Sequence, residues 1–70
     1  MDVHKRFGHR IRQLRQRAEL TQKQLAARAR LSATSLSNIE CGVHAPGFRK
    51  LPRLAQALGV EVHELFLFDQ

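Results

Sequence analysis

The sequence predicts an all-α fold, and three observations lead to this prediction. Apolar residues recur at spacings of three and four along most of the chain, no alternating stretch exceeds a few residues, and Tyr and Trp, which favour strands, are absent. With 70 residues and no linker long enough to divide them, the chain is expected to form a single domain over residues 1–70. We therefore expect a compact bundle of five helices.

The first helix is expected from about residue 4 to residue 18. Gly8 inside this stretch should weaken the helix slightly. Five apolar residues step by four, four, three and four along it and form one inward stripe: Val3, Phe7, Ile11, Leu14 and Ala18.

The second helix is expected over 22–29. Thr21 stands three residues before Gln24, which is the spacing of a capping box, and Leu20 precedes the cap at the position of a hydrophobic staple. The inward residues of this helix include two small alanines that let another helix approach closely: Leu25, Ala26 and Ala29.

The third helix is expected over 33–40. Ser32 is a good cap, Leu36 and Ile39 point inward, and Gly42 can take the left-handed stop. The second and third helices are separated by a very short break, which is the layout of a helix-turn-helix.

The last two helices are expected over 49–58 and 62–66. Pro52 fits only in the first turn of a helix, so the fourth helix should begin at about Arg49 or Lys50. The last helix has Glu61 at its cap position and should fray at its beginning. The inward residues of the two helices are Phe48, Leu51, Leu54, Ala55 and Leu58, followed by Val62, Leu65 and Phe66.

Positive charge is concentrated in the first part of the chain. The 12 Lys and Arg residues exceed the 6 acids, and residues 1 to 30 hold nine of the bases against Asp2 and Glu19. This polarity indicates a polyanionic partner, although charge alone does not separate nucleic acid from a solvated basic face. A helix lying on anionic lipid is less favoured, because the core needs its apolar stripe.

Composition and motifs exclude several other classes. A single cysteine excludes an internal disulfide and suits a reducing cytoplasm, and no run approaches the roughly 20 apolar residues of a membrane span. The four histidines form no HExxH motif, and Cys41 and His44 stand at C-x-x-H spacing without a second ligand pair. We therefore expect a cytoplasmic protein that is not an enzyme and that has no metal, no cofactor and no membrane contact.

The segment LTQKQLAARARLSATSLSNIECG, followed by Pro46 and by LPRLAQALGVEVHELF, resembles the Cro and phage-repressor type of helix-turn-helix domain, the Xre-like family of bacterial regulators. The resemblance covers about residues 7–66 and implies that the second and third helices form the helix-turn-helix. The sequence departs from the family pattern at Arg30, where glycine is usual. The backbone there must either accept a side chain at positive φ or turn differently.

The resemblance implies that the helix over 33–40 lies in the major groove of DNA and reads base edges there. Asn can bond adenine on two sides, Thr offers a hydroxyl or a methyl group, and Ala meets only an apolar group such as the thymine methyl. A·T pairs are therefore expected in the contacted core. The implied base-reading residues are Ala33, Thr34, Ser37 and Asn38.

The resemblance also implies that Gln22 holds a DNA phosphate at the start of the second helix, and that Arg15 and Glu40 form an ion pair that orients the third helix and keeps Arg15 near a phosphate. Four further cations lie at or after helix ends and are expected to contact the phosphate backbone, although solvated cations would look the same in sequence: Lys23, His44, Arg49 and Lys50.

We therefore expect a sequence-specific regulator of transcription that binds double-stranded DNA, acts as a repressor, and recognises a palindromic operator as a homodimer. The apolar tail suggests Leu65, Leu67 and Phe68 as the dimer interface, unless the tail folds back over the core. The alternative function is an antitoxin-like or other protein-interaction module with a protein partner and only secondary DNA binding.

Overall fold

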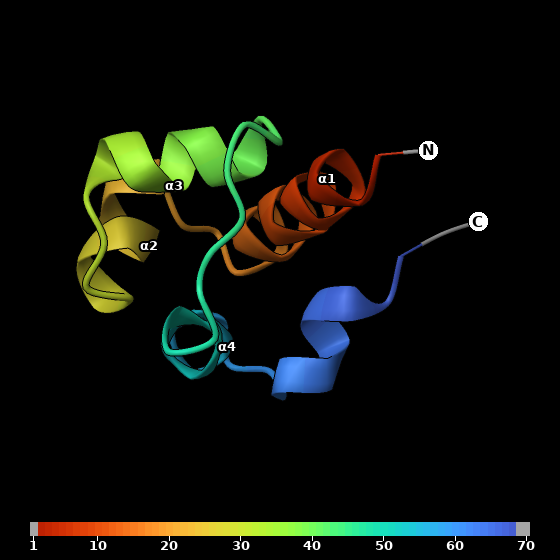
Figure 1. Cartoon of the computed structure of the whole chain (residues 1–70). Coiled ribbons are helices and arrows are strands. Elements are labelled where there is room, and N and C mark those ends of the chain that lie inside the picture. The colour runs from red at the N-terminus through yellow and green to blue at the C-terminus, as the bar shows by residue number, and fades with distance from the viewer. Residues whose placement is uncertain (1, 69–70) are drawn as a thin grey trace.

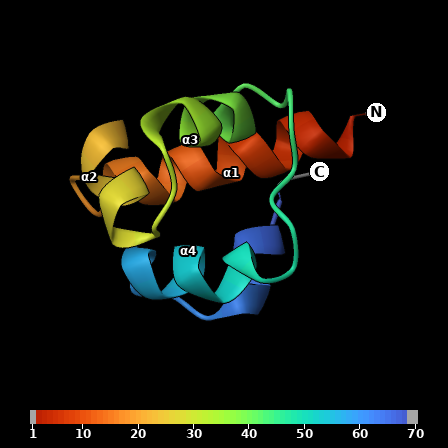
Figure 2. The same cartoon turned by 60° about the vertical axis from the view of Figure 1, so that its left-hand side comes forward.

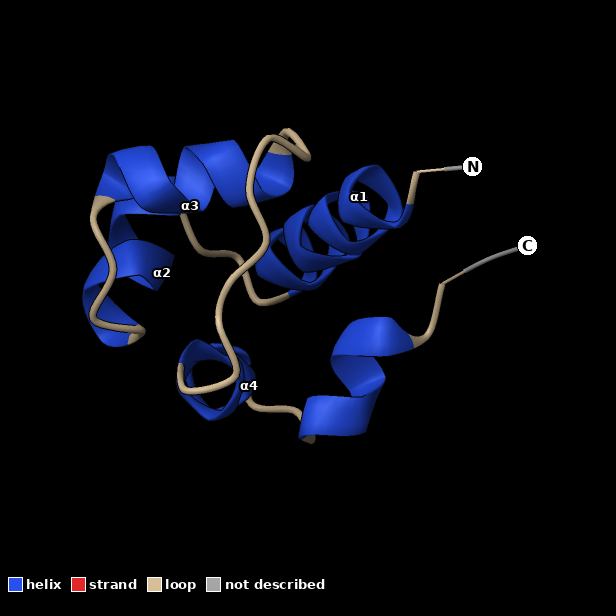
Figure 3. Ribbon diagram, in the orientation of Figure 1, coloured by secondary structure: helices blue, strands red, loops and turns tan. Residues whose placement is uncertain are grey.

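The computed structural model describes residues 2–68. Its α-helices are α1 (Val3–Arg17), α2 (Gln22–Arg28), α3 (Ala33–Glu40) and α4 (Lys50–Leu58), and a 3₁₀ helix, η1, spans Val62–Phe66. Figures 1 and 3 show these elements joined by loops, the longest of which connects α3 to α4, with no strand in the described residues. The predicted all-α class is confirmed.

The fifth element was predicted as an α-helix, and this was wrong. It is a 3₁₀ helix of five residues, in which the Glu64 N–H donates to Glu61 O at 3.0 Å and the Leu67 N–H donates to Glu64 O at 3.4 Å. Such a short segment cannot offset the cost of nucleating an α-helix, so the tighter turn is used. The fold therefore has four α-helices and one 3₁₀ helix over residues 2–68.

Side-chain caps explain where the two central helices begin. The Gln24 N–H donates to Thr21 Oγ1 at 3.1 Å, and the Thr21 N–H donates to Gln24 Oε1 at 2.9 Å, so the predicted capping box is present. Ser32 Oγ accepts from the Ser35 N–H at 3.0 Å and caps α3.

The first helix has a cap that the sequence analysis missed. Asp2 Oδ1 accepts from the His4 N–H at 2.9 Å, and α1 accordingly begins at Val3. The helix ends at Arg17, so the predicted inward position of Ala18 is wrong: Ala18 is exposed and Glu19 turns the chain away with a φ of 59°.

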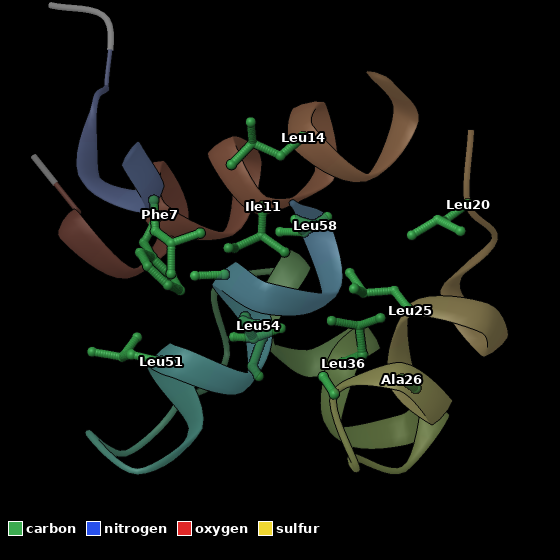
Figure 4. Packing of buried hydrophobic residues seen from close by; sticks show 14 residues of the cluster. Phe7, Ile11, Leu14, Leu20, Leu25, Ala26, Leu36, Leu51, Leu54 and Leu58 are labelled. Atoms are coloured by element: carbon green, nitrogen blue, oxygen red, sulfur yellow. The ribbon is translucent and has the colours of Figure 1, made fainter. Parts of the chain in front are cut away.

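Each of the five elements contributes one large, fully buried side chain to the core: Ile11, Leu25, Leu36, Leu54 and Leu65. Figure 4 shows Ile11, Leu25, Leu36 and Leu54 among the side chains that gather between the helices. The principal contacts form a ring in which α1 packs on α3, α3 on α2, α2 on α4, α4 on η1 and η1 on α1. Every element is therefore held from two sides.

Phe48 was predicted to point inward and does not. Phe48 is 90% exposed. It lies in a turn before α4, in which the Lys50 N–H donates to Gly47 O at 3.0 Å. Pro52 lies in the first turn of α4, as predicted.

The turn between α2 and α3 accepts a side chain at positive φ. Arg30 has a φ of 59°, and the Leu31 N–H donates across the turn to Ala26 O at 2.8 Å, so the left-handed geometry usual for glycine is kept.

We predict that Arg30→Gly stabilises the protein by up to about 1 kcal/mol, because glycine removes the left-handed strain at some cost in chain entropy. Urea unfolding followed by circular dichroism measures the change. Arg28→Gly is the matched control within α2 and should destabilise by about 1 kcal/mol. Destabilisation by both variants would contradict the strain argument.

Gly8 permits a close approach between α1 and the end of α3. A Cβ at this position would overlap Ile39 O and lie 2.7 Å from Glu40 O, both of which are backbone atoms that cannot swing aside. The expectation that Gly8 only weakens α1 was incomplete, because this glycine is also where the two helices cross.

We predict that Gly8→Ala destabilises the fold by about 1–3 kcal/mol, although helix propensity alone would favour alanine by about 1 kcal/mol. The sign of the change in unfolding free energy separates the two effects. Gly47→Ala, where a Cβ would meet nothing within 4 Å, is the control and should be near neutral.

Candidate nucleic-acid interface

One flank of α3 is open to solvent while the opposite flank is buried. Leu36 and Ile39 are 0% and 3% exposed and anchor the helix on the core. The four predicted base-reading residues lie together on the outer flank: Ala33 and Thr34 exposed, and Ser37 and Asn38 half-buried. Figure 2 shows α3 lying across α1 at the surface of the molecule. We call the outer flank of these four residues the reading flank.

The reading flank offers hydrogen-bonding groups that the described chain does not use. The backbone oxygen of Asn38 accepts a hydrogen bond from the Val43 N–H at 2.9 Å, while its side-chain amide has no hydrogen bond within residues 2–68. A free amide on an exposed helix flank can donate and accept at the edge of a base.

Glu40 is the last residue of α3, and its carboxylate accepts hydrogen bonds from side chains of two other helices. Arg15 Nε donates to Glu40 Oε2 at 2.7 Å and Arg15 Nη2 donates to Oε1 at 3.1 Å, so the predicted ion pair is bidentate. Arg15 Nη1 also donates to Leu20 O at 2.9 Å. The side chains of Arg15 and Glu40 are only 14% and 3% exposed, which makes this a buried pair whose geometry holds α3 against α1.

Gln22 has a contact that the sequence analysis missed. Its Nε2 donates to Glu40 Oε1 at 3.0 Å, so α2 is tied to the same carboxylate as α1. A side-chain amide carries two N–H donors, and one remains for another acceptor. No sequence signal pointed to this contact, because the spacing of 18 residues between the two positions has no local meaning.

Two of the predicted phosphate-binding residues lie together beside α3. His44 and Lys50 line a shallow hollow of about 250 Å³ together with Ser35, Ile39 and Pro46. Lys23 and Arg49 are exposed but do not line this hollow. Ser35 also lines this hollow, and nothing in the sequence indicated that its hydroxyl would lie there.

The apolar tail is not arranged as predicted. Leu65 is fully buried in the core, so its assignment to a dimer interface is wrong: η1 packs between α1 and α4 and needs this side chain inside. Phe68 folds back, with its ring centroid 6.4 Å from that of Phe7 and 5.6 Å from Arg6 Cζ. Leu67 is 55% exposed.

Other site chemistry is not assembled in this part of the chain. Within residues 2–68, no three His, Cys, Asp or Glu side chains gather as metal ligands, and none of the helices there is long and apolar enough to cross a bilayer. Cys41 is a free, exposed thiol just after α3.

We predict that Arg15→Leu destabilises the fold by about 3–5 kcal/mol, because it leaves the Glu40 carboxylate buried without its cation. Arg15→Leu/Glu40→Leu should cost much less, since no unpaired charge remains. Chemical unfolding of both variants gives the comparison. A loss of under about 1 kcal/mol for Arg15→Leu would show that the pair behaves like an exposed one.

Comparison with known proteins agrees with this geometry. A family model described as a helix-turn-helix domain matches residues 6–67. The uncharacterized HTH-type transcriptional regulator y4dJ of Sinorhizobium fredii is 42% identical over 65 residues, which cover 93% of this chain and 84% of that protein. The immunity repressor protein of Bacillus phage phi105 is 42% identical over 55 residues, covering 79% of this chain and 38% of the length of the repressor.

A solved structure extends the likeness to three dimensions. The restriction-modification controller protein C.AhdI from Aeromonas hydrophila superposes with a TM-score of 0.86 at 34% identity, over 89% of this chain and 94% of that one. The residues matched by the family model include the whole of α2 and α3. The chain therefore belongs to the helix-turn-helix family, of the Xre-like type that its sequence resembles.

Proposed function

We propose that this protein is a sequence-specific repressor that binds a palindromic operator as a homodimer, with α3 of each copy in the major groove. The broader role is carried by the family and by the relatives that share it over most of their length: the chain is a DNA-binding transcriptional regulator. We place its action in the cytoplasm, where it works by binding alone and without catalysis.

The open reading flank on a rigidly held α3 carries this proposal. Ala33 and Thr34 are exposed and short, so the helix backbone can approach base edges closely. Asn38 provides a bidentate contact to adenine, while Thr34 and Ala33 suit thymine methyl groups. The operator core should therefore be rich in A·T pairs.

Phosphate contacts at both ends of the helix-turn-helix would set its register on the duplex. Gln22 and Lys23 begin α2, and His44 and Lys50 converge in the hollow beside α3, with Arg49 next to Lys50. Glu40 does not repel a phosphate, because the carboxylate is buried and paired with Arg15. Three of the five Arg15 donors are used inside the chain, so Arg15 orients α3 and has two N–H groups left for a phosphate.

A homodimer supplies the affinity that one short helix lacks. α3 has eight residues and reaches only a few base pairs, whereas two copies related by a dyad fill successive major grooves roughly 34 Å apart. The operator read by such a dimer has the same two-fold symmetry as the protein.

Selection of bound sequences from a random duplex pool tests the proposal. An inverted repeat with A·T-rich half-sites is the expected result, with log affinity falling steeply as log salt rises. A pool that shows no enrichment at moderate salt would contradict sequence-specific binding and favour a protein-interaction module.

We predict that Asn38→Ala loses discrimination at one base pair per half-site, by about 1–3 kcal/mol, because the bidentate contact is specific to that base. Lys50→Ala should instead weaken all sequences similarly and lower the salt slope by about 1 per half-site. Competition binding on single-base variants of the selected site measures both. Gln56→Ala, an exposed amide on α4, is the control and should change neither quantity. Equal losses on every sequence for Asn38→Ala would contradict its assigned role.

A further inference from the structure

An apolar groove lies at one end of the molecule and is distinct from the reading flank. It is an open hollow of about 340 Å³. Phe48, Val3 and Phe66 are 90%, 63% and 46% exposed, so much of its lining faces solvent. We define the Phe48 groove by its main lining residues: Val3, Phe7, Pro46, Phe48, Leu51 and Phe66.

The Phe48 groove is built from four separate parts of the chain. The first turns of α1, the linker after α3, the start of α4 and the end of η1 all contribute to it. In Figures 1 and 2 the first turns of α1 and η1 lie at the end of the molecule away from α2. None of the four residues of the reading flank lines the groove, although Ala45 and Pro46 line both the groove and the hollow of His44 and Lys50.

We propose that a second copy of this chain covers the Phe48 groove, with Phe48 of each copy seated in the hollow of the other. This inference rests on the homodimer of the proposed function and names its interface. It replaces the tail residues predicted from sequence, of which Leu65 is buried and Phe68 packs on its own chain.

The patch is self-complementary. Phe48 lines the hollow yet is 90% exposed, so the hollow stays open and the ring projects beside it. A two-fold interface requires the same patch on both partners, with each side offering what the other receives. A projecting aromatic ring next to an apolar hollow meets this requirement, and buried aromatic anchors dominate interface energies.

Charge also favours this patch for contact between two copies. The chain carries a net charge of +6, so two copies repel each other over much of their surface. His4 is the one ionisable residue among those that line the hollow, so the centre of such a contact brings no Lys or Arg side chains of the two copies together. The same lack of cations makes the groove a poor site for nucleic acid.

The position of the groove suits an assembly on DNA. The linker that carries Phe48 follows the C-terminal end of α3, and no residue of α3 lines the groove. The reading flanks remain uncovered. An interface of ordinary size takes about 800 Å² from each partner, and the total surface here is 4798 Å², so the contact must include the rim of the groove.

Sedimentation equilibrium of the full chain without DNA tests the interface. The wild-type protein should be a dimer at high concentration, and Phe48→Glu should raise the dimer dissociation constant by about 30-fold or more. Phe48→Leu keeps an apolar side chain and should dimerise much more tightly than Phe48→Glu. Leu67→Glu introduces the same charge at the other exposed apolar candidate and should leave the dimer unchanged.

Several outcomes would overturn the interface. They are a wild-type chain that stays monomeric both free and on DNA, a dimer that survives Phe48→Glu, or equal dissociation by Phe48→Glu and Leu67→Glu. Unfolding of Phe48→Glu, seen by circular dichroism, would also overturn it, because the fold of one chain would then need this exposed ring.

The interface and the proposed function can fail separately. A dimer that dissociates on Phe48→Glu but selects no DNA sequence would retain the interface and refute the repressor. A protein that selects an operator while its dimer survives Phe48→Glu would retain the function and refute the interface.

Discussion

The buried Glu40 carboxylate is the constraint on which the functional geometry depends. It accepts from Arg15 of α1 and from Gln22 of α2, and it belongs to α3, so three helices meet on one group. A buried charge is costly unless it is paired, so a shift of α3 that broke these hydrogen bonds would be unfavourable. Gly8 allows α1 to lie close to the C-terminal end of α3. With a larger residue at this position, α1 would clash with the backbone oxygens of Ile39 and Glu40.

The hydrogen bonds to Glu40 explain how a chain of 70 residues can hold its reading helix in place. α3 is buried along Leu36 and Ile39 and pinned at its end by Glu40. Its outer flank can therefore hold short side chains in a defined position, as close contact with base edges requires.

Two surfaces of the chain differ in their chemistry. His44 and Lys50 line the hollow beside α3. Exposed apolar groups lie at the Phe48 groove, where the lining holds a single ionisable residue, His4. The two surfaces come from overlapping stretches of sequence, since the linker after α3 carries both His44 and Phe48. This arrangement links contact with a polyanion to contact with a second copy through a few residues of one loop.

Local signals in the sequence were sufficient for the starts of α2, α3 and α4, because caps and proline act within a few residues: Thr21 with Gln24, Ser32 and Pro52 mark these starts. The family resemblance added the pairing of Arg15 with Glu40. Tertiary structure alone decided that Gln22 joins this pair, that Gly8 is a crossing point, that Leu65 lies inside and that Phe48 lies outside. These outcomes depend on which distant segments meet, and apolar spacing shows that a side chain is buried somewhere without showing against what.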